Sequence, residues 1–170
     1  MVARSPELRH HFTTTAKILN MSHPDTRNAP LEQAQRRAID LLYRAFSDQN
    51  PDLMDVAVTA DWDDIPLAPG QGPGPEGLKP IIRGFIEALP DVRITAHEVL
   101  MGQGRAAVRA EITGTHRGPL FGIAATGKKV SFRIHEFHEF EGERIKRTWH
   151  LEDWFGLFQQ IGAFPALGNP

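Results

Sequence analysis

The stretch that decides the fold is KKVSFRIHEFHEFEGERIKRTWHLED, residues 128–153. On both sides of Gly142, apolar side chains alternate with polar ones at the period of two that is typical of β-strands. The pattern predicts two strands, Lys128–Phe140 and Arg144–Asp153. A glycine-containing turn joins them, so we expect them to pair as an antiparallel hairpin.

The same alternation extends toward the N-terminus. It predicts strands over about Val92–Met101 and Arg105–His116, so that four strands form an antiparallel meander. Before Pro90 the apolar spacing changes to three and four, which predicts a helix over Leu78–Leu89. A glycine- and proline-rich loop, residues 68–75, precedes this helix.

Two more helices are predicted upstream of that loop. Apolar residues recur at helical spacing from Leu31 to Ala45, and a short helix fits Asp52–Val58 after Pro51. Residues 1–30 lack sustained periodicity and are interpreted as an N-terminal extension. Residues 31–170 are therefore expected to form one domain.

The chain ends in an apolar segment, Trp154–Phe164, which predicts a short helix that covers the sheet. Helices come first and strands second, so the predicted fold class is α+β. We expect a curved antiparallel sheet that wraps around the N-terminal helices, with a short C-terminal helix.

Composition excludes several classes of partner and chemistry. The formal net charge of the 170 residues is -2, with 24% charged residues and no cysteine. We see no basic stripe for nucleic acid or anionic lipid, no thiolate site, and no apolar run long enough to span a membrane. We therefore expect a cytoplasmic protein with neither nucleic acid nor membrane as a partner.

One face of the third predicted strand turns polar where a core is expected. An apolar row is interrupted by a carboxylate and an imidazole before it resumes, so this face either reaches solvent or lines a cavity. The row consists of Val130, Phe132, Ile134, Glu136, His138 and Phe140.

A register for the hairpin follows if Phe140 pairs with Ile145. Trp149 then lies opposite Glu136, and Asp153 lies opposite Phe132 in an apolar setting that suits a proton-exchanging carboxyl group. Asp153 is the leading acid/base candidate, although an aspartate at this point is also a favoured N-cap for the next helix. A bulge of one residue would exchange the two faces and overturn this assignment.

His116 ends the apolar row of the second predicted strand. It could polarise a substrate carbonyl or donate a proton, or it could be a structural histidine at a strand end. The histidines show no helical metal-ligand spacing, and no nucleotide-binding or serine-hydrolase motif occurs. We therefore expect no metal and no cofactor.

Four segments in this order resemble SnoaL-like polyketide cyclases and related ester cyclases. They are DWDDIPLAPGQGPGPEGLKPIIRGF (61–85), LPDVRI (89–94), GTHRGPLFGIAATGKKVSF (114–132) and RIKRTWHLEDWFGLFQQIGAF (144–164). The resemblance spans about residues 31–164. It implies a nuclear-transport-factor-like cone with an apolar pocket, often in homodimers or homotetramers.

The resemblance also implies site residues. In such cyclases an aspartate on the last strand acts as acid/base, which corresponds to Asp153, assisted by a histidine, for which His116 and His138 are candidates. Trp149 is expected in the pocket wall. Family members often carry a histidine in the segment that here reads DWDDIP (61–66), so Asp64 or Asp63 could give this pocket a second carboxylate.

The leading functional hypothesis is a cofactor-independent lyase or isomerase. It would enolise a small apolar carbonyl compound and close it by an intramolecular aldol reaction, in a cavity shaped by Phe85, Phe132, Ile134 and Trp149. Two alternatives stay open. In one, Asp153 and Arg147 activate water, as in epoxide hydrolases; in the other, the chain is a non-catalytic small-molecule-binding module.

Overall fold

The computed structural model describes residues 29–164, and the predicted extension over residues 1–30 therefore lies almost entirely outside the described residues. Helices precede most of the sheet and a short helix follows it, which confirms the α+β class. The helices are α1 (Ala29–Ser47), the short η2 (Pro51–Leu53) and α2 (Met54–Ala57), α3 (Gly74–Ala88) and α4 (Trp154–Ile161). The strands are β1 (Val58–Ile65), β2 (Arg93–Gly102), β3 (Arg105–Thr115), β4 (Lys129–Glu141) and β5 (Arg144–Glu152).

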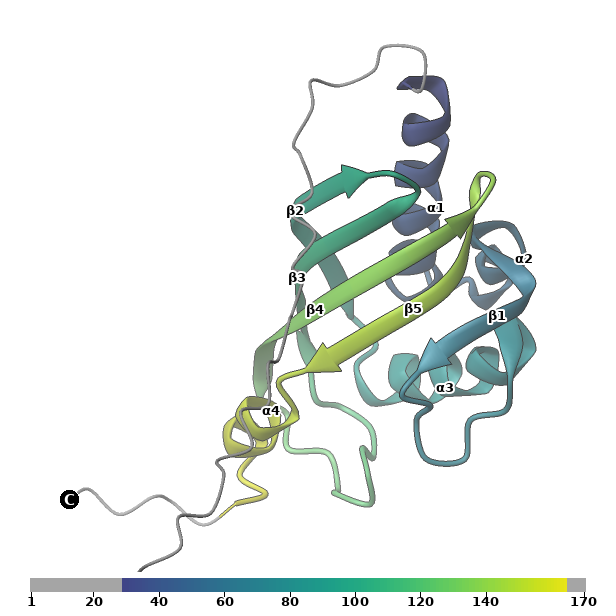
Figure 1. The fold of residues 1–170 in the computed structure, drawn as a ribbon. Helices are drawn as coiled ribbons and strands as arrows, with labels where there is room; N and C mark the ends of the chain where they lie inside the picture. The colour runs from purple at the N-terminus through teal and green to yellow at the C-terminus, as the bar shows by residue number, and fades with distance from the viewer. Residues whose placement is uncertain (1–28, 165–170) are drawn as a thin grey trace, which may run out of the picture.

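The five strands form one open sheet in the order β1-β5-β4-β3-β2 (Figure 1). The pairs from β2 to β5 are antiparallel, as predicted, whereas β1 pairs with β5 in parallel. The sequence analysis did not predict β1, and this strand turns the antiparallel meander into a mixed sheet. It starts directly after α2, so the predicted helix over Asp52–Val58 ends where the edge strand begins.

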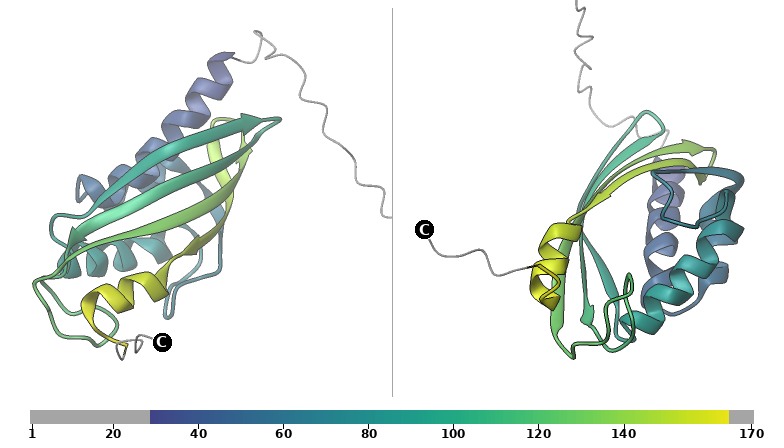
Figure 2. Two further views of the ribbon diagram at one scale, coloured as in Figure 1. Left: turned by 90° about the vertical axis from the view of Figure 1, so that its left-hand side faces the viewer. Right: turned by 90° about the horizontal axis from the view of Figure 1, so that it is seen from below.

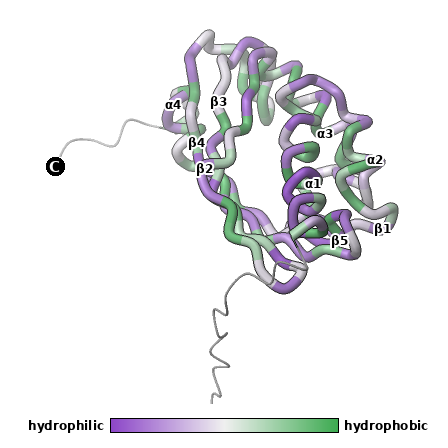
Figure 3. The backbone as a smooth tube through the Cα atoms, turned by 90° about the horizontal axis from the view of Figure 1, so that it is seen from above, coloured by the Kyte–Doolittle hydropathy of each residue, from purple (hydrophilic) through white to green (hydrophobic). Residues whose placement is uncertain are grey.

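The sheet is strongly curved and wraps around α1 and α3, as the views along its length show (Figure 2). In Figure 3 the three N-terminal helices α1 to α3 lie opposite strands β2 to β4. Helix α1 turns one apolar stripe toward the sheet because its buried residues recur at three and four. The largest fully buried side chains come from both layers: Phe132, Met54, Ile82, Leu89, Ile145 and Leu157.

The hairpin of β4 and β5 has the predicted pair Phe140–Ile145, but its register then shifts by one residue. A bulge at Lys146 leaves Arg147 opposite Glu139, and His150 rather than Trp149 lies opposite Glu136. The predicted Trp149–Glu136 pair is therefore wrong. Since side chains alternate along a strand, the extra residue exchanges the two faces of β5 beyond the bulge.

Helix α4 packs against β4 and buries Leu157 and Ile161. Its N-cap is Asp153, whose carboxylate accepts a hydrogen bond of 2.8 Å from the backbone N–H of Gly156. The capping interpretation of Asp153 is thus confirmed. Within the described part of the chain, no helix is long and apolar enough to cross a membrane.

The cap gives a prediction about stability. Asp153→Ala should lower the free energy of unfolding by about 1 kcal/mol, because the N–H of Gly156 loses its acceptor. Asp153→Asn should lose much less, since asparagine caps helices about as well as aspartate. Urea unfolding of the two variants beside the wild type measures both effects, and equal losses would contradict the capping role.

Candidate functional site

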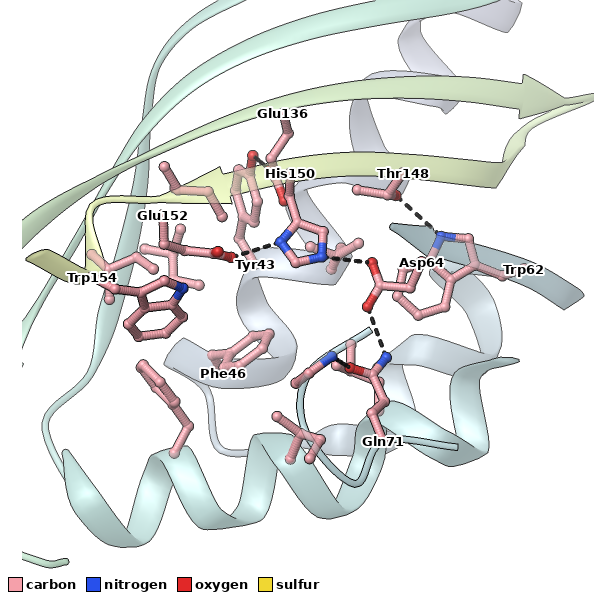
Figure 4. A pocket seen from close by; sticks show the side chains of 18 residues that line it. Tyr43, Phe46, Trp62, Asp64, Gln71, Glu136, Thr148, His150, Glu152 and Trp154 are labelled. Carbon is pink, nitrogen blue, oxygen red and sulfur yellow. Dashed lines mark hydrogen bonds and ion pairs between the residues drawn. The ribbon is translucent and has the colours of Figure 1, made fainter. Parts of the chain in front are cut away.

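A pocket lies between α1, α3 and the concave face of the sheet. It contains about 710 Å³ of empty space, including the open space at its mouth. Most of its wall is apolar, and polar groups reach it mainly from β1, β4 and β5 (Figure 4). The lining residues are Leu42, Tyr43, Phe46, Trp62, Asp64, Ala68, Gln71, Leu78, Ile81, Phe85, Ile94, Ile112, Ile134, Glu136, Thr148, His150, Glu152 and Trp154.

The bulge in β5 determines which polar groups face this pocket. Beyond it, Thr148, His150 and Glu152 point inward, while Arg147 and Trp149 lie on the outer face. The parallel pairing of β1 with β5 places Asp64 next to Thr148. The side chains of Asp64 and His150, from neighbouring strands, therefore meet in the pocket wall (Figure 4).

His150 lies between two carboxylates. Its Nδ1 is 2.8 Å from Oε1 of Glu152, and its Nε2 is 3.2 Å from Oδ1 of Asp64 and 3.0 Å from the carbonyl oxygen of Pro66. Each ring nitrogen thus faces acceptors, so each must carry a hydrogen and the ring is an imidazolium. Burial opposes this charge, but the hydrogen bonds and charges of Asp64 and Glu152 outweigh it and raise the pKa of His150 to about 10.

Asp64 is held from its other side. The side-chain amide of Gln71 donates a hydrogen bond of 2.8 Å to Oδ2 of Asp64 and accepts one of 2.9 Å from the backbone N–H of Ala68. Asp64, His150 and Glu152 thus form a charged row. Gln71 belongs to the glycine- and proline-rich loop before α3, so this loop fixes the Asp64 end of the row. In contrast, Oε2 of Glu152 has no hydrogen-bond partner among residues 29–164.

A second polar group lies around Glu136 on β4. The Tyr43 hydroxyl donates a hydrogen bond to Glu136, and Nε2 of His138 lies 3.6 Å from the same carboxylate. Burial, followed by the charge and hydrogen bond of Glu136, raises the pKa of Tyr43 far above its ordinary value. The phenol therefore stays protonated and keeps donating to Glu136.

A buried chain of hydrogen bonds supports His138 from behind. The indole N–H of Trp62 donates to Oγ1 of Thr148 at 3.1 Å, and Nδ1 of His138 lies 3.1 Å from the same oxygen. Because Thr148 already accepts from Trp62, its own hydroxyl hydrogen is free to point at Nδ1 of His138. Nε2, on the other side of the ring, faces Glu136.

The structure brings only part of the predicted site together. Glu136, Ile134, Asp64 and Phe85 line the pocket. Phe132 and His138 are buried beside it, and the Phe132 ring packs against Phe85 and Trp154.

The other predicted residues lie elsewhere. His116 is completely buried at the end of β3, with Nδ1 3.0 Å from Oγ1 of Thr126. On the outer face, Cζ of Arg147 lies 5.5 Å from the centroid of the Trp149 ring. Asp153 is exposed at the start of α4. The position of the last three follows from the bulge and from the end of β5 at Glu152.

Eight polar or aromatic side chains of the pocket were missed by the sequence analysis. They are Tyr43, Phe46, Trp62, Gln71, Thr148, His150, Glu152 and Trp154. Tyr43 lies in the apolar stripe of α1 and could have been predicted, since a tyrosine hydroxyl buried in such a stripe needs a polar partner. His150 and Glu152 were not predicted because the bulge exchanges the faces of β5.

Among the described residues, no group of three or more His, Asp or Glu side chains is arranged to hold a metal ion.

The pKa of His150 gives a test of the charged row. The ring should stay protonated through neutral pH in NMR spectra of its ring nitrogens. Since the pKa is about 10 in the folded protein and near 6.5 in an unfolded chain, the added stability is complete below pH 6.5 and is lost as pH rises through 10.

The matched variant is His150→Gln, which keeps a polar side chain without the charge. The free energy of unfolding of the wild type should fall more steeply between pH 7 and pH 10 than that of the variant. Parallel pH profiles of the two proteins would contradict an imidazolium at this position.

Comparison with known proteins gives the family. The profile of the SnoaL-like polyketide cyclases matches residues 36–161. No curated protein sequence matches the chain. Among solved structures, TsrD from Streptomyces laurentii is similar at 22% identity and a TM-score of 0.72, over 78% of this chain and 97% of its own.

Two other solved structures are similar to the chain in fold. A protein from Bacillus cereus is 26% identical with a TM-score of 0.69, over 78% of this chain and 83% of its own. A SnoaL-like polyketide cyclase from Agrobacterium tumefaciens is 21% identical with a TM-score of 0.62, over 75% and 98%. These likenesses show the fold, and the family profile extends from α1 to the end of α4. The chain belongs to the SnoaL-like polyketide cyclase family.

Proposed function

We propose that this protein is a cofactor-independent cyclase that enolises a small, mostly apolar carbonyl compound and closes it by an intramolecular aldol reaction. The observation that carries the proposal is Glu152, whose Oε1 lies on the His150 imidazolium and whose Oε2, among the described residues, has no hydrogen-bond partner in a mostly apolar pocket. Family membership supports the reaction class, and the pocket supplies the acid/base group.

Glu152 would act as the base. Its free Oε2 takes a proton from the carbon next to the substrate carbonyl, and the electrons of that C–H bond form the enolate. The enolate carbon attacks a second carbonyl carbon of the same molecule, and the π electrons of that carbonyl move onto its oxygen. Protonated Glu152 then returns the proton to this alkoxide, so the closed product is an isomer of the substrate.

His150 and Asp64 would act as positioning residues. The imidazolium fixes the Glu152 carboxylate through Oε1, and Asp64, itself held by Gln71, fixes the other side of the ring. This row offsets the cost of an ionised glutamate beside apolar side chains. The charge it provides is constant at neutral pH because His150 remains protonated.

A donor for the developing enolate oxygen is also available in the pocket wall. The indole N–H of Trp154 has no hydrogen-bond partner among residues 29–164, and Figure 4 draws its ring below Glu152. A preoriented donor in a pocket of low polarity stabilises negative charge on oxygen. We assign this role to Trp154, the first residue of α4.

The proposal moves the catalytic role away from Asp153 and His116. Asp153 is exposed and its carboxylate caps α4, whereas His116 is buried against Thr126 outside the pocket lining. The water-activating alternative needs Asp153 and Arg147 in the cavity, and neither lines it. The protein would act on a small carbonyl compound without a metal or cofactor, as a cytoplasmic homodimer or homotetramer.

The test compares neighbouring carboxylates. Purified wild type, Glu152→Gln and Asp153→Asn are incubated near neutral pH in D2O with aromatic polyketide esters. Enolisation exchanges deuterium into the carbon next to the carbonyl, which raises the mass, and ring closure changes retention and absorbance without changing the mass. Glu152→Gln should lower both rates by about a hundredfold or more, as expected for loss of a general base.

Asp153→Asn is the matched control, because it keeps the helix cap and makes the same chemical change one residue away. It should react at nearly the wild-type rate. Loss of exchange in Asp153→Asn alone would return the role to Asp153. Ligand binding by the wild type with neither exchange nor closure would make the protein a binding module and overturn the proposal.

A further inference from the structure

The ionisable groups of the pocket wall are strongly unbalanced. Three carboxyl groups, those of Asp64, Glu136 and Glu152, face one cation, the imidazolium of His150. Tyr43 is the remaining ionisable group, and it is tied to Glu136 as a hydrogen-bond donor. The carboxylates belong to three adjacent strands, β1, β5 and β4, so they lie together on the sheet wall of the pocket.

Two strong cations on elements that form the pocket, Arg147 on β5 and Lys79 on α3, are paired outside it. Arg147 lies on the outer face of the sheet, 3.0 Å from both Asp63 and Glu139. Lys79 is buried in α3 among Asp52, Asp55 and Glu76. Among residues 29–164, no lysine or arginine lines the pocket. A ligand carboxylate would therefore meet three carboxyl groups and one cation, the His150 imidazolium, which is already paired with Asp64 and Glu152.

The hydrogen-bonding capacity of the wall has the same bias. The donors of Gln71, Trp62 and His150 are all engaged within the wall. In the described part of the chain, the unengaged polar atoms of the wall are two acceptors, Oε2 of Glu152 and Oε1 of Glu136, and one donor, the indole N–H of Trp154. A bound molecule is therefore met mainly by acceptors, which select ligands that donate hydrogen bonds.

Aromatic rings occupy much of the remaining wall. Figure 4 shows Tyr43, Phe46, Trp62 and Trp154 in the pocket wall, and Phe85 lines it as well. The faces of aromatic rings attract cations, and they do so most strongly where water is displaced. Rings and carboxylates in one pocket thus favour a positively charged donor on an apolar skeleton.

We propose that the pocket selects its ligand by charge, binding a protonated amine carried on a ring skeleton in preference to its neutral counterpart and excluding a carboxylate. This inference rests on the proposed function only in taking the same pocket as the binding site. It adds the chemical class of the ligand: an amine-bearing carbonyl compound without a free acid group. The amine would lie toward Glu136 and Glu152.

The test uses three probes that share one skeleton: 2-naphthylmethylammonium, 2-naphthylmethanol and 2-naphthoate. Titration calorimetry at pH 7 and low salt gives a dissociation constant for each. The ammonium should bind at least about tenfold more tightly than the alcohol, and the carboxylate at least about tenfold more weakly, as a unit charge beside a partly buried carboxylate requires. High salt should reduce the differences in dissociation constant between the charged probes and the alcohol only slightly, because the pocket is recessed.

Glu152→Gln and Asp153→Asn again form a matched pair. Removing the charge of Glu152 should reduce the advantage of the ammonium over the alcohol severalfold and leave the affinity of the alcohol nearly unchanged. The Asp153 variant should keep the wild-type order, since this carboxylate lies outside the pocket.

Three results would overturn the charge selection. They are a carboxylate that binds as tightly as the alcohol, an ammonium that binds no more tightly than the alcohol, and no ammonium binding at millimolar concentration. None of the probes has a proton next to a carbonyl that could be enolised, so these results do not depend on turnover. Deuterium exchange that depends on Glu152, with no charge order among the probes, would leave the proposed reaction intact and reject this inference alone.

Discussion

One extra residue in β5 determines the chemistry of the pocket. Before the bulge at Lys146, Ile145 is buried against the helices; after it, Thr148, His150 and Glu152 take the inward positions. Without the bulge, alternation would turn Arg147, Trp149 and Leu151 inward and leave His150 and Glu152 on the outer face. An arginine would then face the pocket where an imidazolium and a carboxylate now lie, and the acid/base groups of β5 would be lost from it.

The buried charged row formed by Asp64, His150 and Glu152 is stable because its charged groups bind one another. Burying an ion is costly unless opposite charges and hydrogen bonds replace water. His150 meets this condition with Asp64, Glu152 and the carbonyl of Pro66, and Gln71 completes the far end. The free oxygen of Glu152 is the exception, and such an exception is expected where a ligand replaces the missing partner. The Glu152 carboxylate therefore stabilises the imidazolium through one oxygen and is available to a ligand through the other.

The sequence predicted the architecture well because its periodicities are strong. The four antiparallel strands, the α1 and α3 helices and α4 all follow from spacing, and the polar break at Glu136 and His138 marked the pocket face of β4. The edge strand β1 was missed because its residues, VTADWDDI, alternate poorly and carry three aspartates. Its parallel partner β5 is distant in sequence, and such pairings leave no local signal. A bulge leaves none either, since the residue it inserts has an ordinary side chain.

Asp153 and Glu152 show why a motif alone does not identify the acid/base group. The segment that ends in HLEDWFGL (150–157) carried the resemblance to the family, and Asp153 is a prominent carboxylate in it. A helix that must start at Trp154 needs a capping side chain at Asp153 whatever the protein does, so the fold alone accounts for that aspartate. Glu152 caps no helix: its side chain faces the pocket, is mostly buried and, among residues 29–164, forms its hydrogen bond with the imidazolium. A carboxylate that faces the pocket is the better candidate for chemistry than one that caps a helix at the surface, and the one-residue offset between the two is visible only in the register of the sheet.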